Sequence, residues 1–122
     1  MPKPGLTILY VDNPPASAAL YERLLGCASV EVSATFAMFA FPSGVRLGLW
    51  ARPAVVPAAT AAGCGGELAF TVDSAEQVDA TCQAWRALGL PILQEPAQVD
   101  FGHTFVALDP DGHRLRAVCP FG

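Results

Sequence analysis

The sequence has few basic residues and few charges of either sign. Lysine and arginine together number 7 against 11 acidic residues in a chain of 122, which gives a formal net charge of -4. A nucleic-acid-binding surface needs clustered cations to neutralise phosphates, so we expect no nucleic-acid partner. The low charge and the 52% content of hydrophobic residues also exclude a disordered chain and predict a packed core.

The sequence also lacks a long apolar run. A membrane-spanning helix needs about 20 consecutive apolar residues, and every hydrophobic run here is shorter than that. Residues 1–5, Met-Pro-Lys-Pro-Gly, lead directly into a strand pattern without the apolar core of a signal peptide. We therefore expect no membrane partner and a location in the cytoplasm.

Closely spaced cysteine pairs are missing as well. The four cysteines, Cys27, Cys64, Cys82 and Cys119, lie far apart and form no CxxC motif. That spacing excludes the usual zinc and redox motifs. We expect all four to be reduced, structural thiols.

The first half of the chain reads as a strand, a helix and three strands. Residues 6–11 form a β-favouring run, and the turn residues 12–15 lead into a helix that ends at Gly26. The periodicity places Ala16, Leu20 and Leu24 on one apolar stripe of this helix, with Tyr21 and Leu25 beside it. The three following strands are predicted at residues 28–32, 35–41 and 45–50.

The second half repeats this order after a connector rich in proline, alanine and glycine. Asp73 to Glu76 have capping-box spacing at the start of a helix, which ends at Gly89. Val78, Cys82, Trp85 and Leu88 form its expected buried stripe. The four strands of this half are predicted at residues 67–72, 91–93, 103–108 and 113–118, with a turn at 109–112 joining the last two.

The two halves match each other directly in sequence. Residues 11–13 correspond to 72–74, and residues 41–47 correspond to 109–115. We therefore predict an α+β fold in which two βαβββ repeats, at about 5–50 and 67–119 with a connector at 51–66, form one domain over residues 1–122. Neither half can bury a full core alone, so the repeats should form one curved mixed sheet with a concave ligand cup.

The duplicated pattern resembles the vicinal oxygen chelate superfamily, which contains glyoxalases, bleomycin-resistance proteins and extradiol dioxygenases. The supporting segments are 9–12 at the entry to the first helix, 21–26 at its end, 101–105 and 109–113. Together they extend the likeness over nearly the whole chain.

Within that superfamily the chain resembles the phenazine-antibiotic resistance proteins. The segments that carry this likeness are 10–11, 40–44, 49–50, 95–96, 100–105 and 118–120. The resemblance implies a homodimer that binds a planar heteroaromatic antibiotic without transforming it. It also implies an aromatic contact near the end of the last strand of the first half, which here is Trp50.

Enzymes of the superfamily hold a divalent metal through His or Glu side chains on the first and last strands of each half. The resemblance places these four positions at Leu6, Gly48, Glu67 and Arg116. Of these, Glu67 can coordinate a metal and Arg116 would repel one. A shift of the first two positions by one residue introduces no better donor. We expect no metal, no cofactor and no catalytic residue.

Strand alternation defines which residues share the face of the vacated metal positions. Predicted ligand contacts, including two from the Asp100–His103 region, are Tyr10, Gly48, Trp50, Glu67, Phe101, His103 and Arg116. A planar ligand would stack on Trp50, with Gly48 leaving room beside it, and Arg116 or Arg114 would meet a ligand carboxylate.

Each of these residues also has a structural interpretation. Trp50 can pack in the core or at a dimer contact, and Glu67 with Arg116 can form an ion pair. His103 can bond a backbone carbonyl instead of a ligand. Phe101 is expected to close over the ligand from its glycine-adjacent loop, whereas Trp85 is expected in the core.

The sequence thus favours a metal-independent protein that binds and sequesters an aromatic small molecule such as an antibiotic. The alternative is a metal-dependent glyoxalase or dioxygenase-type enzyme whose ligands are misplaced in register or come from a second protomer. A cofactor-free enzyme using Glu67 as base lacks an evident second acid or nucleophile. A structural or regulatory dimer is the third class.

Overall fold

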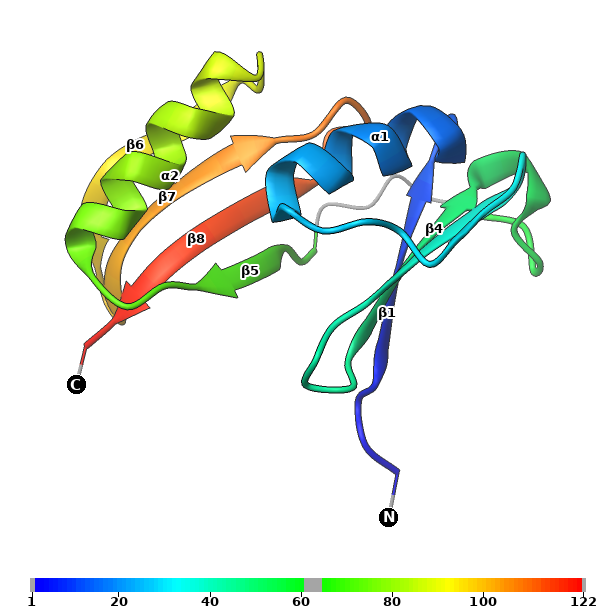
Figure 1. Ribbon diagram of the computed structural model, residues 1–122, viewed down its shortest axis with the longest axis horizontal. Helices are drawn as coiled ribbons and strands as arrows, with labels where there is room; N and C mark the ends of the chain where they lie inside the picture. Colours follow the sequence, from blue (N-terminus) through cyan, green and yellow to red (C-terminus); the bar gives the residue numbers. More distant parts are fainter. Residues whose placement is uncertain (1, 61–64, 122) are drawn as a thin grey trace. The chain divides into compact units, whose positions relative to one another are not determined.

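Each half of the chain folds into a four-stranded mixed sheet with one helix. The computed structural model describes residues 2–60 and 65–121, and it divides into two compact units, residues 1–62 and 63–122 (Figure 1). Each unit contains one βαβββ repeat, which confirms the predicted α+β class and the internal duplication. The union of the two sheets into one concave cup stays a prediction, as does the single domain.

The first unit has strand order β1-β4-β3-β2, with β1 parallel to β4 and the other pairs antiparallel. A single turn of 3₁₀-helix, η1, follows β4. The elements are β1 (Leu6–Val11), α1 (Pro14–Leu25), β2 (Glu31–Val32), β3 (Phe36–Ala40), β4 (Arg46–Ala51) and η1 (Arg52–Ala54).

The second unit repeats that topology, with strand order β5-β8-β7-β6 and β5 parallel to β8. Its helix lies across β6, β7 and β8 (Figure 1). The elements are β5 (Leu68–Thr71), α2 (Ala75–Ala87), β6 (Ile92–Val99), β7 (Gly102–Leu108) and β8 (Arg114–Pro120).

The buried face of α1 differs from the prediction. Asn13 caps the helix by accepting a hydrogen bond from Ala16 N at 3.1 Å, and Gly26 ends it with a φ of 69°. The buried residues are Pro14, Ser17, Ala18 and Tyr21, whereas Ala16 is exposed and Leu20 and Leu24 are only half-buried. Alanine and leucine occur on both sides of this helix, so apolar periodicity alone did not identify the face that meets the sheet.

Helix α2 buries Val78, Cys82 and Trp85 of its predicted stripe, whereas the fourth member, Leu88, follows the helix and is only half-buried. Trp85 packs edge-on against Phe70 and Phe105, at centroid distances of 5.8 and 5.3 Å. This confirms Trp85 as a core residue. The cap differs from the prediction in register: Ser74 accepts from Gln77 N at 3.2 Å, while the Gln77 side chain accepts from Asp73 N at 2.7 Å.

Two strands differ in length from the sequence prediction. The strand expected at 28–32 is reduced to Glu31–Val32. The strand expected at 91–93 extends over Ile92–Val99, with irregular pairing to β7 on both sides of Gln94. β6 is an edge strand and pairs only with β7. Irregular pairing and Pro96 are tolerated at such an edge, so the strand continues beyond them.

None of the helices in residues 2–60 and 65–121 is both long and apolar enough to cross a membrane. The described cysteines, Cys27, Cys82 and Cys119, are free thiols, while Cys64 lies outside the described residues.

Gly102 at the start of β7 provides a test of this packing. A Cβ atom there would lie 2.3 Å from the carbonyl oxygen of Cys119 and 2.9 Å from Cα of Pro120. We expect Gly102→Ala to lower the free energy of unfolding in urea by about 1–3 kcal/mol, because the obstacle is backbone that must move. Gly66→Ala, where a Cβ meets nothing within 4 Å, is the control; equal effects would contradict this account.

Candidate functional site

The face of the first sheet that points away from α1 carries a row of aromatic side chains. Strand pairing places Trp50 directly between Tyr10 on β1 and Phe36 on β3. The Tyr10 ring meets Trp50 edge-on, with centroids 6.5 Å apart and an interplanar angle of 79°. The opposite face is covered by α1, whose Tyr21 packs on Phe39.

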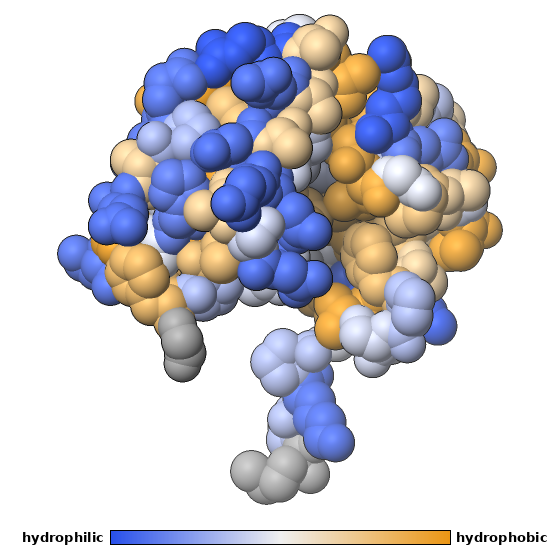
Figure 2. Space-filling view, turned by 60° about the vertical axis from the view of Figure 1, so that its left-hand side comes forward, coloured by the Kyte–Doolittle hydropathy of each residue, from blue (hydrophilic) through white to orange (hydrophobic). Residues whose placement is uncertain are grey.

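This open face is apolar and exposed. Leu6, Ile8 and Tyr10 are 48%, 40% and 37% exposed, although all three are large hydrophobic residues. Figure 2 shows apolar side chains of this kind gathered at the molecular surface. A surface with this composition favours a small-molecule or protein partner over solvent. The predicted placement of Tyr10, Gly48 and Trp50 on one face agrees with the observed strand alternation.

Gly48 does not leave the free space that the sequence suggested. The ring of Phe36 lies over it, so that a Cβ on Gly48 would be 2.8 Å from Phe36 Cζ and 3.1 Å from Cε1. Phe36 pairs with Trp50, two residues further along β4, and its side chain reaches Gly48 diagonally. The Phe36 ring therefore occupies the position beside Trp50 that the sequence had left for a ligand.

The corresponding face of the second sheet carries a polar cluster. The Arg116 guanidinium donates from Nε and Nη2 to the two carboxylate oxygens of Glu67, and from Nη1 to Thr104 Oγ1 at 3.3 Å. The side chains of Arg116 and Glu67 are 14% and 29% exposed. The ion pair considered from sequence is therefore present, and together with Thr104 it engages all three guanidinium nitrogens.

Phe101 adds an aromatic surface to this cluster. Its ring centroid lies 5.7 Å from the guanidinium carbon of Arg116, and the residue is 51% exposed. The loop is held by a hydrogen bond from Phe121 N to Phe101 O at 3.0 Å. A cation–π contact of this kind keeps the guanidinium plane near the rim of the sheet.

His103 belongs to the other side of the second sheet. Its Nε2 lies 3.0 Å from Asp79 Oδ1 on α2, so its partner is a carboxylate and not the backbone carbonyl suggested from sequence. Because His103 and Phe105 alternate with Thr104, His103 faces the helix while Thr104 faces Arg116. The structure does not bring His103 together with Glu67 and Arg116.

His103 instead lines a groove of about 800 Å³ between α2 and β6. Its other lining groups are polar and apolar, and they include Cys82, Arg86 and Glu95. Arg86 Nη2 donates to Glu95 Oε1 at 2.5 Å, and His103 is matched with Asp79. Arg86 and Glu95 neutralise each other, and His103 is already bonded to Asp79, so these groups have less capacity left for a ligand.

Comparison with known proteins settles the family. The sequence pattern of the Glyoxalase/Bleomycin resistance protein/Dioxygenase superfamily matches residues 3–117. The chain belongs to this superfamily. The phenazine antibiotic resistance protein EhpR of Enterobacter agglomerans is 28% identical over 124 residues, which cover 96% of this chain and 91% of that protein.

Solved structures agree with the superfamily fold. A solution NMR structure of a protein from Agrobacterium tumefaciens is 52% identical, covers 100% of both chains and has a TM-score of 0.92. A glyoxalase-related enzyme from Fulvimarina pelagi is 21% identical, with 100% of this chain and 94% of that chain covered and a TM-score of 0.86. At that identity the second likeness shows the fold alone.

The residues at the superfamily's metal positions do not fit a divalent cation. Leu6 and Gly48 offer no side-chain donor, and Glu67 has both carboxylate oxygens engaged by Arg116. A cation placed there would lie beside the guanidinium and would have to displace it. We derive no chemical step through a metal at these positions.

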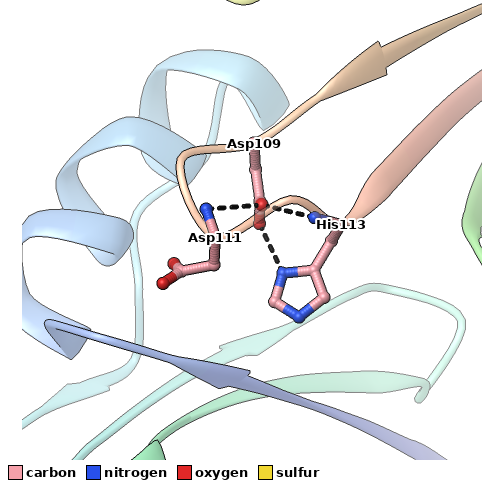
Figure 3. A group of neighbouring side chains, drawn as sticks. All are labelled: Asp109, Asp111 and His113. Carbon is pink, nitrogen blue, oxygen red and sulfur yellow. Dashed lines mark hydrogen bonds and ion pairs between the residues drawn. The ribbon is translucent and has the colours of Figure 1, made fainter. Parts of the chain in front are cut away.

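A second group of donors, Asp109, Asp111 and His113, lies in the turn before β8 (Figure 3). Asp109 Oδ1 accepts from Asp111 N at 3.0 Å and His113 N at 2.8 Å, while Oδ2 lies 2.8 Å from His113 Nδ1. Asp109 is buried, so these bonds compensate its carboxylate and hold the turn closed. These residues stabilise the turn, as their position at the turn predicted from sequence already indicates.

Sequence reasoning missed Phe36 as a contact of the site and Thr104 as a partner of Arg116. A usable signal was present. A hairpin centred on Ser43 pairs position 36 with Trp50, and one centred on Asp111 pairs Thr104 with Val118. Hairpin symmetry therefore identifies both residues once the turn is located.

Cys82 at the groove should be an unreactive thiol. Burial raises the pKa of Cys82, and the nearby Arg86 offsets only part of this effect. The thiol therefore stays protonated at neutral pH, and we expect Cys82 to be alkylated by iodoacetamide more slowly than Cys27 or Cys119 in the folded protein. Site-resolved mass spectrometry measures the rates; loss of the difference in urea is the control, and faster labelling of Cys82 would contradict the prediction.

The Glu67–Arg116 pair should contribute to stability. Glu67→Ala leaves a largely buried guanidinium without its counterion, and we expect a loss of about 1–3 kcal/mol in the free energy of unfolding. Glu95→Ala removes the partner of an exposed arginine and should cost about 0–1 kcal/mol. Urea denaturation of both variants decides the comparison, and the reverse order would refute the greater contribution of the partly buried pair.

Proposed function

We propose that this superfamily member binds a planar aromatic small molecule on the open face of its first sheet and sequesters it without a metal or a chemical reaction. An antibiotic of the phenazine type is the ligand class we favour. The observation that carries the proposal is the aromatic row on the open face, in which Tyr10 is exposed and Trp50 and Phe36 are half-buried. Homodimerisation and a cytoplasmic location complete the proposal as sequence predictions.

The geometry of the row supports stacking as the mode of binding. Trp50 is half-buried between its neighbours, and Tyr10 contacts it by the ring edge. Offset stacking on an indole adds roughly 0.5–1.5 kcal/mol beyond the burial of apolar area. The neighbouring Leu6 and Ile8 would lose their exposed surface to the same ligand.

In the second unit, Glu67, Phe101 and Arg116 form a separate cluster, and their role as ligand contacts stays a sequence prediction. Because Arg116 already donates to Glu67 and Thr104, a hydroxyl or amide substituent would suit this cluster better than a carboxylate that must displace Glu67. Arg114, which is exposed, is the alternative anchor for a carboxylate. The similarity to a phenazine antibiotic resistance protein supports an aromatic ligand.

The test is calorimetric titration of metal-stripped protein with naphthalene, anthracene and phenazine carboxylates. We expect Trp50→Ala to weaken the binding of these ligands by about 3- to 10-fold or more, and Trp50→Phe to retain most of it. Trp50 is half-buried on the face away from α1 and lies outside the core packed against the helix, so the variants should fold. Tryptophan quenching in a Trp85→Phe background provides an independent signal from Trp50.

Val30→Ala, which shortens an exposed side chain elsewhere in the first unit, is the matched control and should leave affinity unchanged. Binding that is equal in wild type and Trp50→Ala would refute the proposal. Protein purified without chelators should also be analysed for metal. One equivalent of tightly held metal, with binding lost on its removal, would favour the enzyme alternative.

A further inference from the structure

The contact between Phe36 and Gly48 explains why a glycine stands in the middle of β4. The backbone at Gly48 does not require glycine, since the described glycines with positive φ are Gly26, Gly44, Gly89 and Gly112. What a side chain at this position would meet is the Phe36 ring, whose Cζ lies 2.8 Å from an added Cβ and would have to shift. The absence of a side chain at Gly48 therefore lets the Phe36 ring pack against β4, where it continues the aromatic surface beyond Trp50.

The ring lies on the sheet and is not locked into the core. Phe36 is half-buried, whereas its chain neighbour Ala37 is completely buried on the α1 side. Apart from the Phe36 ring, the nearest group to a Cβ added at Gly48 is Ile8 Cγ1, at 3.7 Å. Met38, paired with Gly48 across the strands, is also half-buried and has a flexible side chain.

We propose that Phe36 is a specificity-determining residue that limits the size of the aromatic ligand. This inference rests on the proposed function. With its ring over Gly48, Phe36 fills the position that an additional ligand ring beside Trp50 would occupy. Removal of the ring opens the space over Gly48, which is bounded by Ile8, Met38 and Trp50. This space accommodates a ligand with a longer fused-ring system.

The second repeat uses the same diagonal position in a polar form. Thr104 and Arg116 stand in the register that Phe36 and Gly48 have in the first unit, and they are joined by a hydrogen bond of 3.3 Å. In both repeats a residue of the third strand thus reaches diagonally to the last strand and determines what the open face presents. In the first unit the Phe36 ring limits the space above the sheet, whereas in the second unit Thr104 helps to orient the Arg116 guanidinium.

The first experiment tests the contact itself through a double-mutant cycle. Gly48→Ala should lower the melting temperature of the wild-type protein, because the new methyl group must displace the Phe36 ring. In a Phe36→Ala background the same change should have little effect. Equal shifts in both backgrounds would overturn the assigned contact. The cycle needs no ligand and is independent of the proposed function.

The second experiment measures ligand size preference by titrating two-, three- and four-ring aromatic carboxylates into each variant. We expect Phe36→Ala to shift the ratio of the two-ring to the four-ring dissociation constant by about 10-fold in favour of the larger ligand. Phe36→Leu, which keeps an apolar side chain, should shift it less and provides the test should the alanine variant fail to fold. Val30→Ala should leave the ratio unchanged.

The outcomes separate the two proposals. Trp50-dependent binding with an unchanged ratio in Phe36→Ala and Phe36→Leu would overturn the role of Phe36 and leave the proposed function standing. Absence of binding by wild type to the whole series would overturn the proposed function, and the size limit with it.

Discussion

Both candidate clusters depend on the register of the hairpin that ends each repeat. Gly44 N and Gly112 N donate to the carbonyls of Phe41 and Asp109 at 2.8 and 3.0 Å, and each turn closes with the same second backbone bond. A slip of one residue would move every side chain of the last strand to the other face. The glycines at φ of 92° and 85° make this turn geometry accessible.

Given that register, alternation separates two environments in each unit. Side chains on the helix side build the core, with Phe39 under Tyr21 in the first unit and Trp85 between two phenylalanines in the second. Side chains on the open side remain available for binding. His103 shows how strict this separation is, because it neighbours Thr104 in sequence and yet contacts α2.

The duplication has allowed the two open faces to diverge chemically while the backbone stayed the same. In the first unit, the positions that the superfamily's enzymes use for metal hold Leu6 and Gly48, and the surrounding face is aromatic. In the second they hold Glu67 and Arg116, which neutralise each other. At these positions the first unit therefore presents an apolar surface and the second a closed ion pair.

The sequence by itself determined the βαβββ order, the duplication, the turn residues and the placement of Tyr10, Gly48 and Trp50 on one strand face. These features follow from local propensity and strand periodicity, which act over a few residues. Tertiary structure decided the buried face of α1, the partner of His103 and the filling of the space over Gly48 by Phe36. Each of these three features depends on a contact with a side chain of another element. Periodicity within one segment carries no information about such a contact.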